Sequence, residues 1–487
     1  MNRFLLPLSL LLLSIAMAAP RSGAAATNLI VAAGDGVALT AYCTHPFDAR
    51  RIMPDDDGAS ALATGLDAVA ARGASEALSL VVRSPAAVQS LSIEVADLVA
   101  GDKTLPANII DIRIVKVWYQ SGNAWFTEIA DHGRPVLVPE LLLHNDNLVR
   151  TDPKARSNLV LSKGQHLPCT QAGLVADDDA ATLQPFTLAA GAARQLFVGI
   201  TVPRDAAPGY YTGRLTFEAD GRPAGYMPVA LRVLPYVLPP PRARFSDRPF
   251  VYYAPAGLGS FTTPPPSDFR PITFATTPDY RQQAHLHKVH LFTQTATLRQ
   301  LEPVRAIGAM ALDAAPPLPG IENPAVWRRK KGIIAFLAGY DGIYLAAITD
   351  PVAPWNEAGR PVYRSRSLLY PTATAALHTL ASEALRAAAT DVAYLSYLHT
   401  LAQGLLAADD HTIVVEGRRA LAWTEDISKS SPAPDTVRLD AIAWIERLRQ
   451  FAPSRPDALA CTGGTHAAPP PTATASAAVK AARMPPP

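Results

Sequence analysis

The chain has 487 residues, of which 49% are hydrophobic and 18% are charged. This length corresponds to two or three domains, and the composition is ordinary for globular proteins. Its 44 basic and 42 acidic residues give a formal charge of +2 with no block of one sign, so we expect no nucleic-acid partner.

The N-terminus is typical of a secretory signal peptide. Arg3 supplies a positive charge, residues 4–15 are apolar, and Ala16-Met17-Ala18 forms a small-x-small cleavage site. We therefore assign residues 1–18 to a signal peptide and expect an exported protein, periplasmic or extracellular. The apolar stretch is shorter than the about 20 residues that span a bilayer, so we expect no integral membrane segment after cleavage.

The three cysteines, Cys43, Cys169 and Cys461, have no Cys-x-x-Cys spacing for metal or redox chemistry. An exported protein can form disulfides. Two outcomes are open, a bridge between Cys43 and Cys169, which both lie in the N-terminal half, and three unpaired thiols.

Residues 28–238 show the period-2 alternation of β-strands. Apolar and polar residues alternate at 91–95, 110–114, 196–202 and 227–233. The adjacent apolar pair Ile114-Val115 indicates a β-bulge. Strands with one solvent-exposed face and turn-rich connections favour an antiparallel β-sandwich over 28–238.

Two triple prolines, at 239–241 and 264–266, predict a stiff proline-rich linker over 239–278. Between them, Phe250 to Tyr253 is a short candidate strand. The tail at 462–487 has no periodicity, and we expect it to be disordered.

Residues 279–452 combine strand and helix signals, which predicts an α/β domain with C-terminal helices. We expect a helix at 279–288 and strands at 289–293, 307–312, 333–337 and 343–348. The last two flank a Tyr340-Asp341-Gly342 turn. Leucines at helical spacing predict a long helix after Pro371 and a last helix with Asp435 as its N-cap.

Several segments resemble a family of bacterial exported proteins. They are Gly320 to Pro324, Trp327-Arg328, Gly339 to Gly342, Pro354 to Asn356, and residues 386–395 with Asp391 and Tyr394. They resemble the barrel of domain-of-unknown-function 4091 proteins, which are related to glycoside hydrolase family 123. The segments "LVPELLLHNDNLVRTD" and "TVPRDAAPGYYTGRL" are similar to the N-terminal sandwich of that family.

The resemblance implies a glycoside-hydrolase-like (β/α) barrel after the sandwich, and here the chain departs from the family. Residues 246–425 are fewer than the about 200 to 250 residues that a (β/α)8 barrel takes. We therefore expect an incomplete barrel, with the missing part between the strand near residue 290 and the strand near residue 310. That is the part that the resemblance implies would carry the acid/base pair.

Glycoside hydrolysis needs two carboxyl groups, or one acid with a carboxylate that orients the substrate's acetamido group. Asp313 follows a strand end, where barrel active sites lie, and is one candidate acid. Asp341, in its Tyr-Asp-Gly turn, is the second candidate, as an acceptor for sugar hydroxyls. Each has a plain structural alternative, a turn before Pro316-Pro317 for Asp313 and an Asx turn for Asp341.

Four further residues are candidate substrate-binding groups. Tyr340 and Trp355 are interpreted as stacking platforms for pyranose rings, with Asn356 beside Trp355 in a proline-rich loop. Arg364 is placed to bind an acidic sugar. The alternatives are a loop anchor packed on the core for Trp355, and an ion pair with Glu357 or Asp391 for Arg364.

No metal or other cofactor is implied. His285, His287 and His290 lack a carboxylate at ligand spacing apart from Asp279. Glu383 and Arg386 stand three apart on the predicted long helix, and we expect a surface ion pair.

Two functions are consistent with this sequence. The first is an exported carbohydrate-active protein resembling a glycoside hydrolase, acting on N-acetylated hexosaminides if Asp313, Glu322 or Asp341 has taken over the catalytic roles. The second is a catalytically inactive pseudoenzyme, a saccharide-binding or cell-surface scaffold protein. Both predict a poly- or oligosaccharide partner, and neither defines the oligomeric state.

Overall fold

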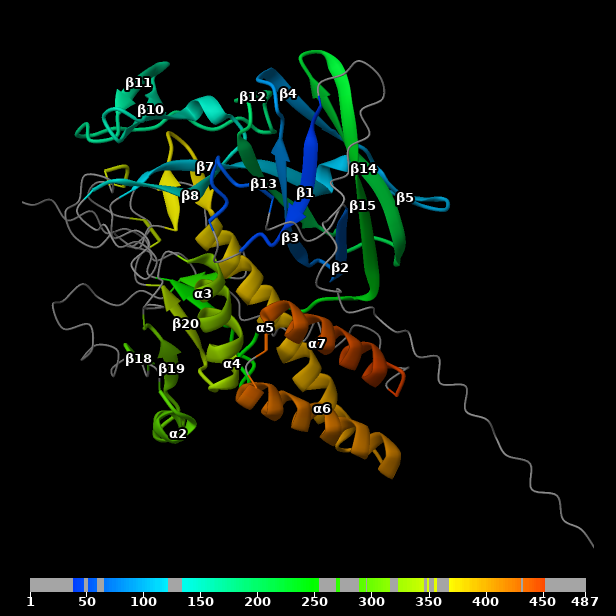
Figure 1. Cartoon of the computed structure of the whole chain (residues 1–487). Coiled ribbons are helices and arrows are strands. Elements are labelled where there is room, and N and C mark those ends of the chain that lie inside the picture. The colour runs from blue at the N-terminus through cyan, green and yellow to red at the C-terminus, as the bar shows by residue number, and fades with distance from the viewer. Residues whose placement is uncertain are drawn as a thin grey trace, which may run out of the picture.

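The computed structural model describes residues 38–47, 51–58, 65–120, 134–253, 269–271, 289–294, 296–315, 323–345, 348–349, 354–356, 368–430 and 432–451. The expected signal peptide, the helix expected at 279–288 and the expected tail lie outside these ranges. The described chain combines antiparallel-rich sheets with an α/β part, which agrees with the predicted fold class of β plus α/β (Figure 1).

Two seven-stranded sheets hold most of the strands. The first has the order β1-β3-β13-β7-β8-β22-β21, and its pairings are antiparallel. The second has the order β12-β4-β14-β15-β2, with β5 and β6 beside β14 and with β2 parallel to β15. A third, small sheet has the order β11-β10-β9 and packs against β7 of the first sheet.

The strands of these sheets are β1 (Thr40–Thr44), β2 (Leu66–Arg72), β3 (Ser75–Arg83), β4 (Val88–Val95), β5 (Leu98–Ala100), β6 (Lys103–Leu105), β7 (Ile110–Gln120), β8 (Val136–Leu143), β9 (Val149–Asp152), β10 (Ser157–Ser162), β11 (Gln165–Pro168), β12 (Phe186–Leu188), β13 (Ala193–Thr201), β14 (Gly209–Ala219), β15 (Arg222–Val237), β21 (Leu369–Pro371) and β22 (Ala376–Thr379).

These strands form where the sequence alternates between apolar and polar residues. In β15 the side chains of Met227, Val229 and Leu231 are buried, whereas Pro228 and Arg232 are exposed. Apolar residues of both sheets belong to one hydrophobic core. Burial of one face of each strand therefore holds the two sheets together.

The predicted bulge lies close to an observed irregularity. The pairing of β7 with β8 shifts register between Lys116 and Val117, two residues after the predicted Ile114-Val115. Ile114 and Val115 are both fully buried, which is why two successive apolar residues are tolerated there.

A five-stranded parallel sheet follows, with the order β17-β16-β20-β19-β18. Its strands are β16 (Val251–Tyr253), β17 (Phe269–Pro271), β18 (Val289–Phe292), β19 (Met310–Asp313) and β20 (Gly342–Leu345). Within this sheet, the first strand in sequence, β16, pairs with the last, β20, and the sheet is open between β17 and β18. The segment 239–278, expected to be a linker, contributes β16 and β17 to this sheet.

The helices are α2 (Leu298–Ala306), α3 (Pro324–Arg328), the π-helical η4 (Arg329–Ile334), α4 (Ala335–Leu337), α5 (Leu380–Leu405), α6 (His411–Ser430) and α7 (Pro434–Arg449), with the short 3-10 turns η1 (Ala107–Ile109) and η2 (Asp146–Leu148). The predicted long helix and last helix are thus present as α5 and α7. No helix within the described ranges is long and apolar enough to cross a membrane.

One predicted strand and one predicted cap are wrong. Residues 333–337 are helical, because Gly332 lets the α3-η4-α4 segment lie directly on α5, where a Cβ at Gly332 would approach Ala388 Cβ to 3.0 Å. This packing overrides the β-preference of Ile333 and Ile334. Asp435 lies in the first turn of α7 rather than at its N-cap, because Pro434 occupies the first helical position.

Of the two outcomes left open for the cysteines, the Cys43–Cys169 bridge does not form. Both thiols are free and buried. Cys43 belongs to the main core and Cys169 to a separate cluster under the small sheet, so the fold holds them apart. The Cys43 thiol donates to the carbonyl oxygen of Gly65 at 3.1 Å.

Helix α5 is the element against which α3, α6, α7 and β3 pack (Figure 1). At its centre the carboxylate of Asp391 is fully buried. Its Oδ2 accepts a hydrogen bond from Arg328 Nε at 2.8 Å and its Oδ1 accepts one from Arg438 Nε at 2.6 Å. One carboxylate therefore binds an arginine of α3 and an arginine of α7.

The two arginines extend this network to the first sheet. Arg438 also donates to Glu76 of β3, and Arg328 Nη1 donates to Asp435 at 2.6 Å. Asp435 in turn lies 2.8 Å from His45 Nε2, just after β1. The helices and the sheet are thus joined by buried ion pairs as well as by apolar contacts.

The network predicts a large loss of stability when Asp391 is replaced. Asp391→Ala should lower the free energy of unfolding by about 3–5 kcal/mol, because it leaves two buried guanidinium groups without their shared partner. The measurement is urea unfolding of the purified protein.

The matched control is Asp426→Ala on α6, whose carboxylate is 73% exposed and pairs with the exposed Lys429. That change should stay within about 0.5 kcal/mol of the parent. Equal and small effects of both variants would contradict the role given to Asp391.

Candidate functional site

Asp313 lies at the carboxyl end of β19, the position that the sequence predicts. Its side chain is buried, and its Oδ2 accepts a hydrogen bond from Lys331 Nζ at 2.9 Å. Its Oδ1 accepts one from the backbone N–H of Ala315 at 3.0 Å. The buried ammonium group of Lys331, on η4, therefore neutralises this carboxylate.

Asp341 lies at the amino end of β20, the strand next to β19. It directly precedes β20, so its carboxylate is at the amino end of a parallel strand. Its Oδ2 accepts from Ala311 N–H at 2.9 Å and its Oδ1 from the Ser246 hydroxyl at 3.3 Å. Asp341 is 3% exposed, and its carboxylate ties the turn to β19. It does not form the expected Asx turn, because the N–H of Ile343, which such a turn would use, donates to the carbonyl oxygen of Phe250.

The two aromatic residues predicted as stacking platforms are inside the protein. Tyr340 is 2% exposed, and its hydroxyl oxygen accepts from Ala296 N–H at 2.6 Å. Trp355 is also 2% exposed and packs edge-on against Trp118, with its Nε1 donating to the carbonyl of Pro371 at 3.0 Å. Neither ring has a face open to a sugar, and for Trp355 this corresponds to the alternative of a loop anchor packed on the core.

Most of the other residues singled out from the sequence lie outside the described ranges. Asn356 is half-buried, and its Oδ1 has no hydrogen-bond partner among the described residues. Arg364 and Glu322 lie outside the described residues, as do His285 and His287. Across the described ranges we find no cluster of histidine, cysteine or carboxylate side chains arranged to hold a metal.

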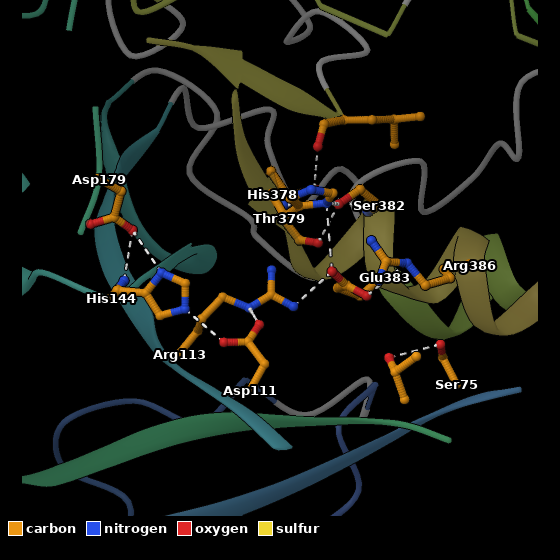
Figure 2. Close-up of polar contacts among 12 residues, drawn as sticks. Ser75, Asp111, Arg113, His144, Asp179, His378, Thr379, Ser382, Glu383 and Arg386 are labelled. Atoms are coloured by element: carbon orange, nitrogen blue, oxygen red, sulfur yellow. Dashed lines mark hydrogen bonds and ion pairs between the residues drawn. The ribbon is translucent and has the colours of Figure 1, made fainter. Parts of the chain in front are cut away.

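A polar cleft lies elsewhere, between the first sheet and the start of α5 (Figure 2). Strands β3, β7 and β13 form one wall, and Glu383, Arg386 and Ala387 of α5 form the other. Asp111 and Arg113 both project into the cleft from β7, because residues two apart on a strand share a face.

Glu383 is the centre of the charges around the cleft. Its side chain is 4% exposed, and its Oε1 accepts from Arg113 Nη2 at 2.8 Å. Arg386 Nε lies 3.4 Å from Oε2, and His378 Nδ1 lies 3.5 Å from Oε1. The expected Glu383–Arg386 pair is present, but its carboxylate is buried rather than on the surface.

A second chain of contacts leads away from Arg113. Arg113 Nε lies 2.9 Å from Asp111 Oδ2, and Asp111 Oδ1 lies 2.7 Å from His144 Nε2. Asp179 accepts from the backbone N–H of His144 at 2.7 Å (Figure 2). Asp111 is 46% exposed, so this end of the chain of contacts is open to solvent.

The pKa shifts in this cluster follow from burial and charge. Burial opposes ionisation of Glu383, but Arg113, Arg386 and His378 outweigh it and lower its pKa to about 2. Burial lowers the pKa of His378 to about 4, against the attraction of Glu383. Glu383 is therefore a carboxylate and His378 a neutral imidazole at neutral pH.

The sequence contains partial signals for this cluster. Asp111 and Arg113 occupy the polar positions of an alternating strand, and Glu383 and Arg386 have helical i, i+3 spacing. Nothing in the spacing shows that the strand and the helix meet across more than 250 residues of chain, as the Arg113–Glu383 contact requires.

Comparison with known proteins identifies a similar fold. The structure resembles a family 123 glycoside hydrolase from Clostridium perfringens, described as acting in glycolipid glycan hydrolysis, with a TM-score of 0.50 and 9% sequence identity. The match covers 85% of this chain and 99% of that chain. A glycoside-hydrolase-like fold is thereby supported, and at this identity the likeness concerns the fold alone.

Two other structures overlap too little to carry an argument. A non-cellulosomal cohesin from Archaeoglobus fulgidus has 10% identity, covers 35% of this chain and 87% of its own, and has a TM-score of 0.15. AvmM, which catalyses a macrocyclisation in alchivemycin A biosynthesis, has 7% identity, covers 43% and 99%, and has a TM-score of 0.20. No family model and no curated protein sequence matches the chain.

The His378 environment predicts how stability changes with pH. Because the pKa of His378 is about 4 in the folded protein and ordinarily 6.5, the unfolded chain binds more protons between these values. The free energy of unfolding should therefore fall as pH is lowered from about 6.5 to about 4. His378→Gln should remove part of this slope in urea unfolding measured across that range.

The control for this prediction is His411→Gln, at an exposed position on α6. It should leave the slope as in the parent. The explanation fails if His378→Gln and His411→Gln give the same dependence on pH.

Proposed function

We propose that this protein is an exported saccharide-binding protein with a glycoside-hydrolase-like fold, in which the barrel is shortened and the strand-end carboxylate of Asp313 does not catalyse hydrolysis. This is the pseudoenzyme hypothesis of the sequence analysis. The observation that carries it is the neutralised carboxylate of Asp313.

The strand order supports a barrel origin for the parallel sheet. In a (β/α) barrel each strand pairs with its neighbours in sequence and the last strand pairs with the first. The order β17-β16-β20-β19-β18 follows this rule except between β17 and β18. Residues 272–288, which connect these two strands, are fewer than the about 30 residues of one βαβ unit.

This strand order indicates a different position for the missing part of the barrel. The sequence analysis places the missing part between the strands near residues 290 and 310, but β18 and β19 are adjacent and parallel. We propose that the lost units lay between β17 and β18. The two seven-stranded sheets that share one core support the predicted sandwich before it.

The positions of the carboxyl groups favour a protein that does not hydrolyse glycosides. A glycosidase needs carboxyl groups on both sides of the scissile bond. Among the described residues that end a strand of the parallel sheet, Asp313 is the only carboxylate, and it binds Lys331. Asp341 lies at the amino ends of the strands, where barrels conserve residues for stability rather than catalysis.

The alternative is a hydrolase of N-acetylated hexosaminides. The likeness to the Clostridium perfringens enzyme favours it, since that protein is described by its action on glycolipid glycans. Under this alternative, residues beyond the described ranges, such as Glu322, would supply a catalytic group.

The test is a panel of aryl glycosides, including N-acetylgalactosaminides and N-acetylglucosaminides, with the mature protein, Asp313→Asn and Asp341→Asn. We expect no turnover by any of the three and binding of at least one saccharide by calorimetry. Turnover by the parent that is lost in Asp313→Asn would contradict the proposal and establish a hydrolase.

A further inference from the structure

The burial of Tyr340 and Trp355 leaves open where a saccharide would bind. We propose that the cleft between β3, β7, β13 and the start of α5 is the saccharide site, and that it binds neighbouring hydroxyl groups of one sugar unit. This inference rests on the proposed function and names a location that is separate from the parallel sheet.

The rim of the cleft offers both donors and acceptors. Ser75 Oγ and Thr201 Oγ1 lie 3.1 Å apart at its exposed edge. Asp111 is 46% exposed and Arg386 is 38% exposed, so one carboxylate and one guanidinium group are open to a ligand. A diol can donate to the carboxylate and accept from the guanidinium group, which matches this arrangement.

Glu76 also borders the cleft, and its carboxylate oxygen Oε2 accepts a hydrogen bond from Arg438. Glu76 alternates with Ser75 and Ala77 along β3, so its side chain is directed to the other face of the strand. The groups that face a ligand are therefore those of the rim.

The size of the cleft limits what enters it. The volume in which the centre of a water molecule can lie is about 40 Å³. One water needs about 10–15 Å³ of such volume. The cleft therefore has room for a few waters, or for the hydroxyl groups on one edge of a sugar that displace them. The rest of the ligand would remain outside.

Gly199 allows a direct steric test. It lies on β13 between Phe197 and Thr201, on the same face, and all three line the cleft. A Cβ at this position would approach Phe197 Cε1 to 3.5 Å, an ordinary contact distance. Gly199→Val should therefore be accommodated by the strand while its methyl groups occupy the cleft.

The experiment measures binding of methyl galactoside, methyl glucoside and their 2-acetamido derivatives by calorimetry and by ligand-observed NMR. The variants are Gly199→Val and the double variant Ser75→Ala with Thr201→Val. The control is Thr212→Val, an exposed threonine of β14 on the other sheet. Thermal unfolding confirms that each variant is folded.

We expect binding to weaken by at least about tenfold in both cleft variants, the loss that corresponds to about 1.4 kcal/mol, and to stay unchanged in Thr212→Val. If the parent binds a sugar and the folded cleft variants bind it equally well, the cleft is not the site, although the proposed function stands. If the parent binds none of these sugars, this inference and the proposed function are both wrong.

Discussion

The shared binding of Arg328 and Arg438 by Asp391 is the interaction on which the rest of the structure depends. The carboxylate is fully buried on α5, and its two partners come from α3 and α7. Arg438 continues to Glu76 on β3, so the same contacts fix the helix against the first sheet. Removing one member would leave buried charges unpaired, whereas complete pairing gives one defined arrangement of helix and sheet.

The polar cleft follows from this arrangement. Asp391 and Glu383 are two turns apart on α5, and each binds an arginine, Arg438 and Arg113 respectively. Glu76 belongs to both regions, since it binds Arg438 and lines the cleft. Ion pairs that hold α5 on the sheet thus also leave a small polar space beside it, which we interpret as a binding site.

Much of the architecture could be predicted from local patterns. Alternation predicted β13 and β15, and leucine spacing predicted α5 and α7, because burial of one face imposes these periods. The helix at 324–337 was missed, since Ile333 and Ile334 favour strands and the packing of Gly332 on Ala388 is non-local. Asn323-Pro324 is an N-cap and first-position signal that could have revealed this helix.

The candidate site could be predicted only in part. Asp313 lies at the strand end that the pattern predicted. Its partner Lys331 lies on η4, just before residues 333–337, and no helix was predicted there. Tyr340 and Trp355 were identified as aromatic residues near turns, and sequence alone does not distinguish an exposed ring from a buried one.

The most direct measurement is a crystal structure of the protein soaked with a sugar that it binds. The account predicts sugar density in the cleft beside Asp111 and Arg386, and density at the carboxyl end of β19, beside Asp313, would contradict it.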